Sequence, residues 1–167
     1  MQGSGQSELT CAPTEVSMSE TSLQQLHAPG GICFGCGPAN SKGLQIASFA
    51  DGDALICDWT PEAHHAAFPG VLNGGIIGAL LDCHCNWMAA WAIMKDQAAE
   101  QLPCTVTADF AVQLKRPTPA EDPVHLRAWI VELEGKKARV ESTLESGGVV
   151  CATCTGTFIA VGPGHPA

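Results

Sequence analysis

The stretch from Gly74 to Met94 is almost entirely apolar, and Asp82 is its only acidic residue. A segment of this length and composition is either buried in a protein core or placed in a membrane. A buried carboxylate costs several kcal/mol unless it is paired or hydrogen-bonded. Asp82 therefore indicates a chemical use, the structural alternative being a helix aspartate that faces solvent or a water molecule.

We interpret this stretch as a core helix, although it approaches the roughly 20 apolar residues of a bilayer crossing. Asp82, His84 and Asn86 stand near its middle, and one central aspartate costs about 2.5–3.5 kcal/mol on insertion scales. Asn73 before Gly74 and Gly75 predicts a helix start, because an asparagine side chain accepts hydrogen bonds from the first free N–H groups. We expect no membrane contact.

The chain has 167 residues and a formal net charge of −9, which favours one folded domain and argues against nucleic acid as a partner. Residues 1–28 are polar and predict a flexible leader that holds a short helical turn around Thr21 to Leu26. Residues 29–162 are expected to form a single domain, and 163–167 a tail. No basic segment followed by an apolar core stands at the N-terminus, so we expect a cytoplasmic protein.

The nine cysteines are an odd number, and most lie in apolar runs, so they do not indicate a disulfide scaffold. Cys33 and Cys36 have a zinc-like spacing, and a four-ligand site would need two more ligands. The possible sources are Cys83, His84, Cys85 and the pair Cys151 and Cys154. Cys83 and Cys85 would point to different faces of a helix, however. The prediction is that these cysteines pack or form turns and that no metal is bound; a redox or zinc protein remains the rival interpretation.

Short alternating or apolar runs bounded by turn residues predict strands elsewhere. Asp51 and Gly52 indicate a hairpin between the expected strands 44–49 and 54–59. The later connections are too short for parallel crossovers, so the sheet should be antiparallel. One long helix against a curved antiparallel sheet is an α+β fold. The expected strands are 44–49, 54–59, 105–116, 124–133, 137–144 and 149–161.

Several motifs occur together in order and spacing. They are Cys33-Phe34-Gly35-Cys36-Gly37 with Asn40 and Gly43-Leu44, then Phe68-Pro69-Gly70-Val71-Leu72-Asn73-Gly74-Gly75-Ile76-Ile77 leading to Leu80-Leu81-Asp82, and Arg116-Pro117. This pattern, over about residues 32–161, resembles the hotdog-fold acyl-CoA thioesterases of the PaaI-like, phenylacetate-degradation type. The resemblance implies a sheet wrapped around a central helix, a homodimer or a homotetramer built as a dimer of dimers, and hydrolysis of an acyl-CoA without a metal or redox cofactor.

Thioester hydrolysis needs donors for the developing oxyanion and a base or nucleophile. Gly74 and Gly75 can expose N–H groups at a helix start without side-chain obstruction, and Asp82 is the internal acid. At 1.5 Å per residue, Gly74 and Asp82 lie about 12 Å apart along one helix. We therefore predict an active site shared between two subunits.

Four further positions are candidate site residues, either from the family resemblance or from the chemistry of their side chains. Thr107 matches a hydroxyl that helps to hold the water or carboxylate in relatives, and Lys115 and Arg116 are natural ligands for the phosphates of coenzyme A. Phe68 is expected to line an apolar substrate site.

The chain also departs from the family pattern. Relatives usually have histidine at the position of Asn73, although asparagine still suits a helix cap. The acidic or small residues that usually follow the aspartate are replaced here by Cys83-His84-Cys85-Asn86. Some relatives carry an amide at Ala67, for which His64 or His65 could substitute. These departures keep open a second function, a hotdog protein that binds an acyl group or a small apolar ligand without cleaving it.

Overall fold

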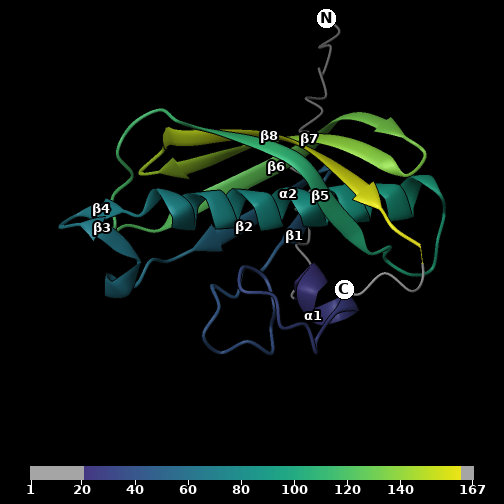
Figure 1. The fold of residues 1–167 in the computed structure, drawn as a ribbon, viewed down its shortest axis with the longest axis horizontal. Coiled ribbons are helices and arrows are strands. Elements are labelled where there is room, and N and C mark those ends of the chain that lie inside the picture. The colour runs from purple at the N-terminus through teal and green to yellow at the C-terminus, as the bar shows by residue number, and fades with distance from the viewer. Residues whose placement is uncertain (1–20, 163–167) are drawn as a thin grey trace, which may run out of the picture.

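One curved antiparallel sheet covers one side of a long helix in the computed structural model, which describes residues 21–162 (Figure 1). The helix α2 spans Gly74–Asp96. The sheet has six strands in the order β1-β2-β6-β7-β8-β5, all neighbours antiparallel. This confirms the predicted α+β hotdog architecture. In sheet order the strands are β1 Phe49–Asp51, β2 Ala54–Trp59, β6 Val124–Glu134, β7 Lys137–Ser146, β8 Val149–Ala160 and β5 Thr105–Leu114.

The helix begins where the sequence predicted. Asn73 is the N-cap, and its side chain accepts hydrogen bonds from the N–H groups of Gly75 and Ile76. By length and composition α2 could cross a membrane, but 67% of its most apolar window is buried inside the protein. It is the core helix of the fold, and Leu80, Leu81 and Met88 on it are almost fully buried.

The expected strand at 44–49 is wrong over most of its length, since β1 begins only at Phe49. Gln45 has a positive φ of 51°, which interrupts an extended strand. The N–H groups of Leu44 and Ile46 donate instead to the carbonyl oxygens of Phe34 and Gly35. Residues 44–48 therefore hold the preceding loop rather than extend the sheet.

Three short elements lie between β2 and α2 in the chain. A 3-10 turn spans Ala63–His65, and β3 Ala66–Phe68 pairs with β4 Val71–Leu72. They stand at the end of the molecule where α2 begins (Figure 1).

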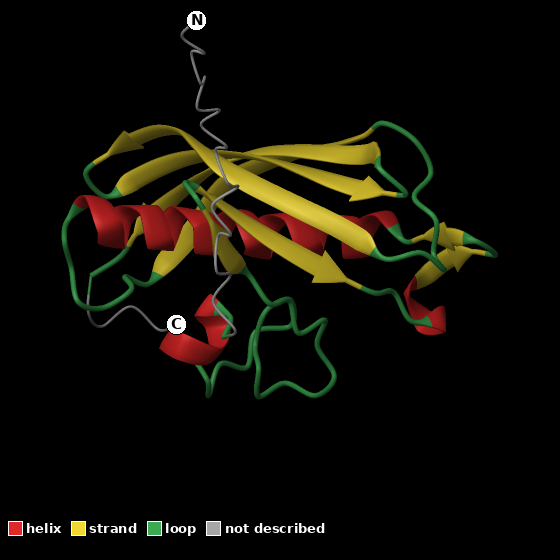
Figure 2. Cartoon of the chain, turned by 180° about the vertical axis from the view of Figure 1, so that it is seen from behind, coloured by secondary structure: helices red, strands yellow, loops and turns green. Residues whose placement is uncertain are grey.

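A short helix, α1 Leu23–His27, falls within the range that the sequence assigned to the leader. Leu23 and Gln24 are buried, so packing against the core begins before residue 29. Residues 1–20 of the predicted leader and the predicted tail at 163–167 lie outside the described residues. Figure 2 shows α1 and the loop that follows it on the side of α2 away from the sheet.

His84 explains one departure of α2 from a purely apolar helix. It is fully buried, its Nε2 lies 3.1 Å from the Leu55 carbonyl oxygen, and its Nδ1 lies 2.9 Å from Ser48 Oγ. Gln24 Nε2 donates to the same Ser48 hydroxyl. A neutral imidazole that donates from Nε2 and accepts at Nδ1 satisfies every contact. His84 thus ties α2 to β2 and α1.

Candidate active site

Asp82 lies on the third turn of α2 and is half-buried. Thr107 Oγ1 on β5 donates a hydrogen bond of 2.8 Å to Asp82 Oδ1. Burial raises the pKa of Asp82 above its ordinary value, and the Thr107 hydrogen bond opposes that rise. Among residues 21–162 no other side chain bonds to this carboxylate, so its second oxygen is available to a substrate or water.

A second pair, one helical turn further on, fixes the same two elements. Thr105 Oγ1 donates to Asn86 Oδ1 at 2.7 Å, and Asn86 Nδ2 donates to the Thr105 carbonyl at 3.2 Å. Four residues on a helix advance about 6 Å, and two residues on a strand about 6.6 Å. Both pairs can therefore form at once, which aligns Thr107 with Asp82. The register of β5 shifts between Thr107 and Asp109, and such bulges commonly re-aim side chains beside active sites.

Asp82 opens into a pocket of about 530 Å³, here called the acid pocket. Its walls come from α2, from the chain leading into β5, and from the segment after α1. Apolar groups predominate, which suits an acyl or aryl group. Its lining includes His27, Cys33, Cys36, Cys83, Trp87 and Cys104.

A separate pocket of about 490 Å³, here called the glycine pocket, lies at the start of α2. Gly74 lines it together with Phe68, Lys115 and Arg116. The N–H groups of Lys115 and Arg116 both donate to the Cys151 carbonyl oxygen on β8, which fixes the backbone beyond β5. Both basic side chains are exposed.

The two glycines at the helix start differ in their hydrogen bonds. The Gly75 N–H donates to Asn73 Oδ1 at 2.7 Å. Within the part of the chain that the structure describes, no acceptor bonds to the Gly74 N–H. Gly74 therefore offers a free donor, whereas Gly75 offers one only when the Asn73 side chain moves.

The predicted site residues thus form two groups in one chain. Asp82 and Thr107 meet at the acid pocket, and Gly74, Phe68, Lys115 and Arg116 meet at the glycine pocket. Gly74 and Asp82 are both on α2, so about 12 Å of helix axis separates them.

Sequence reasoning missed two features of these pockets. The loop residues Cys33 and Cys36 form part of the acid pocket and lie beside Cys83. Thr118 lines the glycine pocket, and its buried hydroxyl has no hydrogen-bond partner among the described residues. The Cys-x-x-Cys spacing was a usable signal for the first feature, but a single threonine after Arg116-Pro117 carried none for the second.

The upstream histidines lie outside both pockets. His65 is buried, and its Nδ1 accepts from the Glu62 N–H. Burial, then the charge of His64, lowers the pKa of His65. The residues that line the two pockets include neither histidine.

Three solved structures share this fold. A thioesterase superfamily protein from Shewanella loihica PV-4 is 28% identical over 75% of this chain and 98% of its own, with a TM-score of 0.61. A phenylacetic acid degradation-related protein from Ralstonia eutropha JMP134 is 21% identical over 74% of this chain and 90% of its own, with a TM-score of 0.61. The E. coli PaaI protein is 17% identical over 74% and 85%, with a TM-score of 0.62.

Sequence comparison gives the family directly. Among curated proteins, no sequence matches this chain. The thioesterase superfamily profile matches residues 69–152, which include the start of α2, Asp82 and Thr107 and extend into β8. The chain therefore belongs to the thioesterase superfamily.

Proposed function

We propose that this protein hydrolyses an acyl-CoA to the free acid and coenzyme A. The observation that carries the proposal is the Asp82 carboxylate, held by Thr107 at the mouth of a largely apolar pocket. Asp82 serves as the general base or the nucleophile. The Gly74 and Gly75 N–H groups of a second copy of the chain serve as oxyanion donors.

The unpaired edge of β5 supports such a shared site. β5 is an edge strand of the sheet, and Phe110 and Leu114 on it are 45% and 57% exposed. A long apolar edge strand is a template for pairing with another chain. Antiparallel pairing of β5 with its copy places the start of one strand beside the end of the other. The acid pocket of one chain, lined by Thr105, then lies near the glycine pocket of the other.

The chemistry follows from these positions. When Asp82 is the base, it takes a proton from water as the water oxygen bonds to the thioester carbonyl carbon. The carbonyl oxygen gains negative charge and accepts the Gly74 N–H. Collapse of this intermediate breaks the C–S bond and releases the acid and the coenzyme A thiolate, which takes up a proton. When Asp82 is the nucleophile, the same collapse leaves an anhydride that water then opens.

Substrate recognition is assigned to the glycine pocket. Lys115 and Arg116 are exposed beside it and suit the phosphates of coenzyme A. Phe68 is 70% exposed at the same place, which suits contact with an apolar part of the ligand. We place the enzyme in the cytoplasm, since the eight cysteines within residues 21–162 are free thiols. We expect it to assemble as a homodimer or a dimer of dimers, as the shared site requires.

The test measures loss of thioester absorbance for short-chain and aryl acyl-CoAs, because exposed protein cysteines would react with a thiol reagent. Wild type should turn over at least one substrate, and Asp82→Asn should lose roughly 100-fold or more. Asp96→Asn, an exposed aspartate on the same helix, is the matched control and should keep activity. Equal rates for wild type and Asp82→Asn would refute the proposal.

A second candidate is a protein that binds an acyl-CoA or a small apolar ligand without cleaving it. The bond from the Gly75 N–H to Asn73 Oδ1 favours it, because one of the two oxyanion donors is already occupied. This function predicts saturable binding of an acyl-CoA, measured by calorimetry, with no turnover by wild type.

A further inference from the structure

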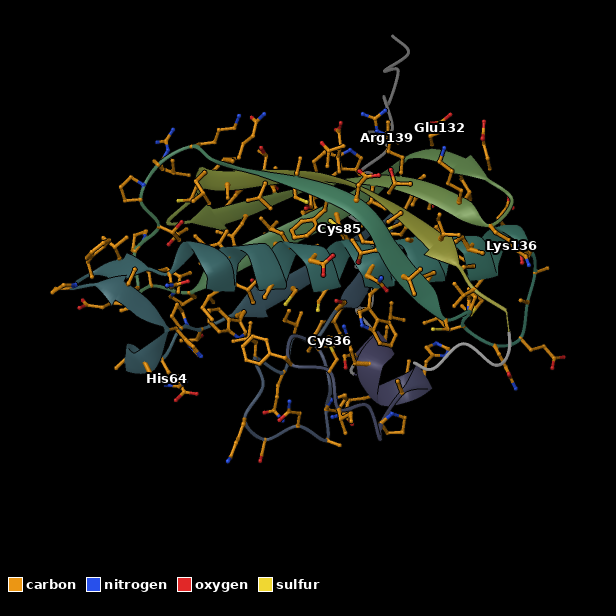
Figure 3. The ribbon with its side chains drawn as sticks, in the orientation of Figure 1. Cys36, His64, Cys85, Glu132, Lys136 and Arg139 are labelled. Carbon is orange, nitrogen blue, oxygen red and sulfur yellow. The ribbon has the colours of Figure 1, made fainter. Side chains whose placement is uncertain are left out.

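Three cysteines from distant parts of the sequence converge on one wall of the acid pocket. Cys33 and Cys36 come from the loop after α1, and Cys83 follows Asp82 on α2. Their Sγ atoms all lie within 4.8 Å of one another. Figure 3 shows Cys36 on the side of α2 away from the sheet and Cys85 on the sheet side. Cys85 instead bonds to Ser142 on β7, so it is not part of this cluster, here called the cysteine triad.

The spacing within the triad fits one tetrahedral ion. Thiolates bound to Zn²⁺ at about 2.3 Å in tetrahedral geometry lie roughly 3.8 Å apart. The Cys33 and Cys83 Sγ atoms are 3.8 Å apart. Cys33 and Cys36 also have the two-residue gap that is usual for paired zinc ligands.

The loop is folded to bring these sulfur atoms together. A Cβ atom added at Gly35 would lie 2.3 Å from Cys83 Sγ, and one added at Gly37 would lie 2.5 Å from the Cys33 backbone nitrogen. Only glycine fits at either position. The Gly37 N–H donates to the Cys33 carbonyl, and the Leu44 and Ile46 N–H groups hold the loop from the other side. The triad is therefore a built feature rather than a chance contact of surface thiols.

All three cysteines of the triad line the acid pocket, so a fourth coordination position faces that space.

From this arrangement we propose that Cys33, Cys36 and Cys83 form a Zn²⁺ site with three thiolate ligands and a fourth position open to the acid pocket. The ion binds the loop to α2 at the residue next to Asp82. The site is independent of the hydrolysis proposed above, because binding needs no thioester. The protein can therefore lack zinc and still hydrolyse a thioester, or bind zinc without hydrolysing one, so the two proposals fail separately.

The experiment uses the full chain, purified without chelator from zinc-supplemented cells. Elemental analysis should find about one zinc ion per chain, falling to about a tenth of that or less in Cys33→Ser, Cys36→Ser and Cys83→Ser. Cys104→Ser is the matched control, since Cys104 is exposed and lines the same pocket outside the triad. It should keep its metal.

Wild type alone gives a second measurement that does not depend on variants folding. Zn²⁺ added to the chelator-treated protein should protect Cys33, Cys36 and Cys83 from alkylation, mapped by mass spectrometry, and leave Cys104 reactive. Co²⁺ in place of Zn²⁺ should give thiolate-to-cobalt charge-transfer bands and the intense visible bands of tetrahedral cobalt. The proposal is overturned if wild type stays metal-free after incubation with Zn²⁺, if Zn²⁺ protects no triad cysteine, or if a disulfide joins two of the three.

Discussion

Thr107 Oγ1 donates a 2.8 Å hydrogen bond to Asp82 Oδ1 and is the one side chain that hydrogen-bonds to this carboxylate among the described residues. The bond joins an edge strand to the central helix at the point where an acid opens into a pocket. It orients the carboxylate and holds one of its oxygens, while the other faces the pocket.

Thr107→Val should move the acid limb of the pH–activity profile to higher pH. The hydrogen bond from Thr107 lowers the pKa of Asp82, against the rise that burial causes. Without it the pKa rises further, so the ionised base is lost at a higher pH as the solution is acidified. The measurement is kcat/KM against pH at equal metal content. Thr105→Val is the control, because Thr105 bonds to Asn86; a limb that moved equally in both variants would contradict the role of Thr107.

Gly74→Pro should abolish the oxyanion donor and spare the helix. Gly74 is the first residue of α2, a position that favours proline, and Asn73 before it is extended with φ −65° and ψ 131°. Removing one oxyanion donor typically lowers kcat roughly 100- to 1000-fold. The thermal midpoint, measured by calorimetry, should change little.

Mixing this variant with Asp82→Asn tests the shared site. A mixed dimer keeps one site with an intact Asp82 and an intact Gly74 from opposite chains, so activity should reappear after the two inactive proteins are unfolded and refolded together. A mixture that stays as inactive as its components would exclude a site formed by two chains.

Two substitutions at Asn73 should distinguish its role in helix capping from an effect on catalysis. Asn73→Ala removes the acceptor for the Gly75 and Ile76 N–H groups and should lower the free energy of unfolding by about 1 kcal/mol. Asn73→Asp keeps the cap, yet places a negative charge beside the N–H groups that must bind an oxyanion. It should retain stability and lose activity. Urea unfolding and steady-state kinetics on both variants check this, and full activity in Asn73→Asp would place the oxyanion elsewhere.

Phe110→Lys should convert the assembly to monomers and remove activity. Phe110 is 45% exposed on the edge strand β5, and a lysine on an edge opposes pairing with a second strand. Light scattering after size exclusion gives the mass. Ile159→Lys on β8, which is also partly exposed at 38% but lies inside the sheet order, is the control that should stay associated. An active Phe110→Lys monomer would show that one chain suffices.

Stability should fall as pH falls from about 7 to about 5 because of His84. Burial lowers the pKa of His84 to about 4, against about 6.5 in an unfolded chain. In that window the unfolded state binds more protons than the folded state. The contribution of His84 to the free energy of unfolding is therefore fully present above pH about 7 and declines on acidification. The expected loss by pH 5 is roughly 2 kcal/mol from this group. His84→Gln should have lower stability at pH 7 and a shallower decline; an unchanged slope of unfolding free energy against pH would contradict the prediction.

Local sequence patterns are enough to predict the framework of this protein. The apolar run with its single acid predicted α2, Asn73 and the glycines predicted where it starts, and strand patterns predicted β5 to β8 with errors of one or two residues at their ends. These elements are specified by local patterns of apolar residues, caps and turns, which neighbouring residues encode directly.

Which side chains meet depends on how the elements pack, and local patterns do not show it. Gln45 has a positive φ, and the segment around it holds a loop where a strand was expected. That loop places Cys36 beside Cys83, and it places Cys33 beside Cys83 across 50 positions of sequence. The pairing of Thr107 with Asp82 likewise depends on how β5 lies along α2. Such contacts depend on the relative placement of whole elements, which packing against the core fixes and which no local pattern contains.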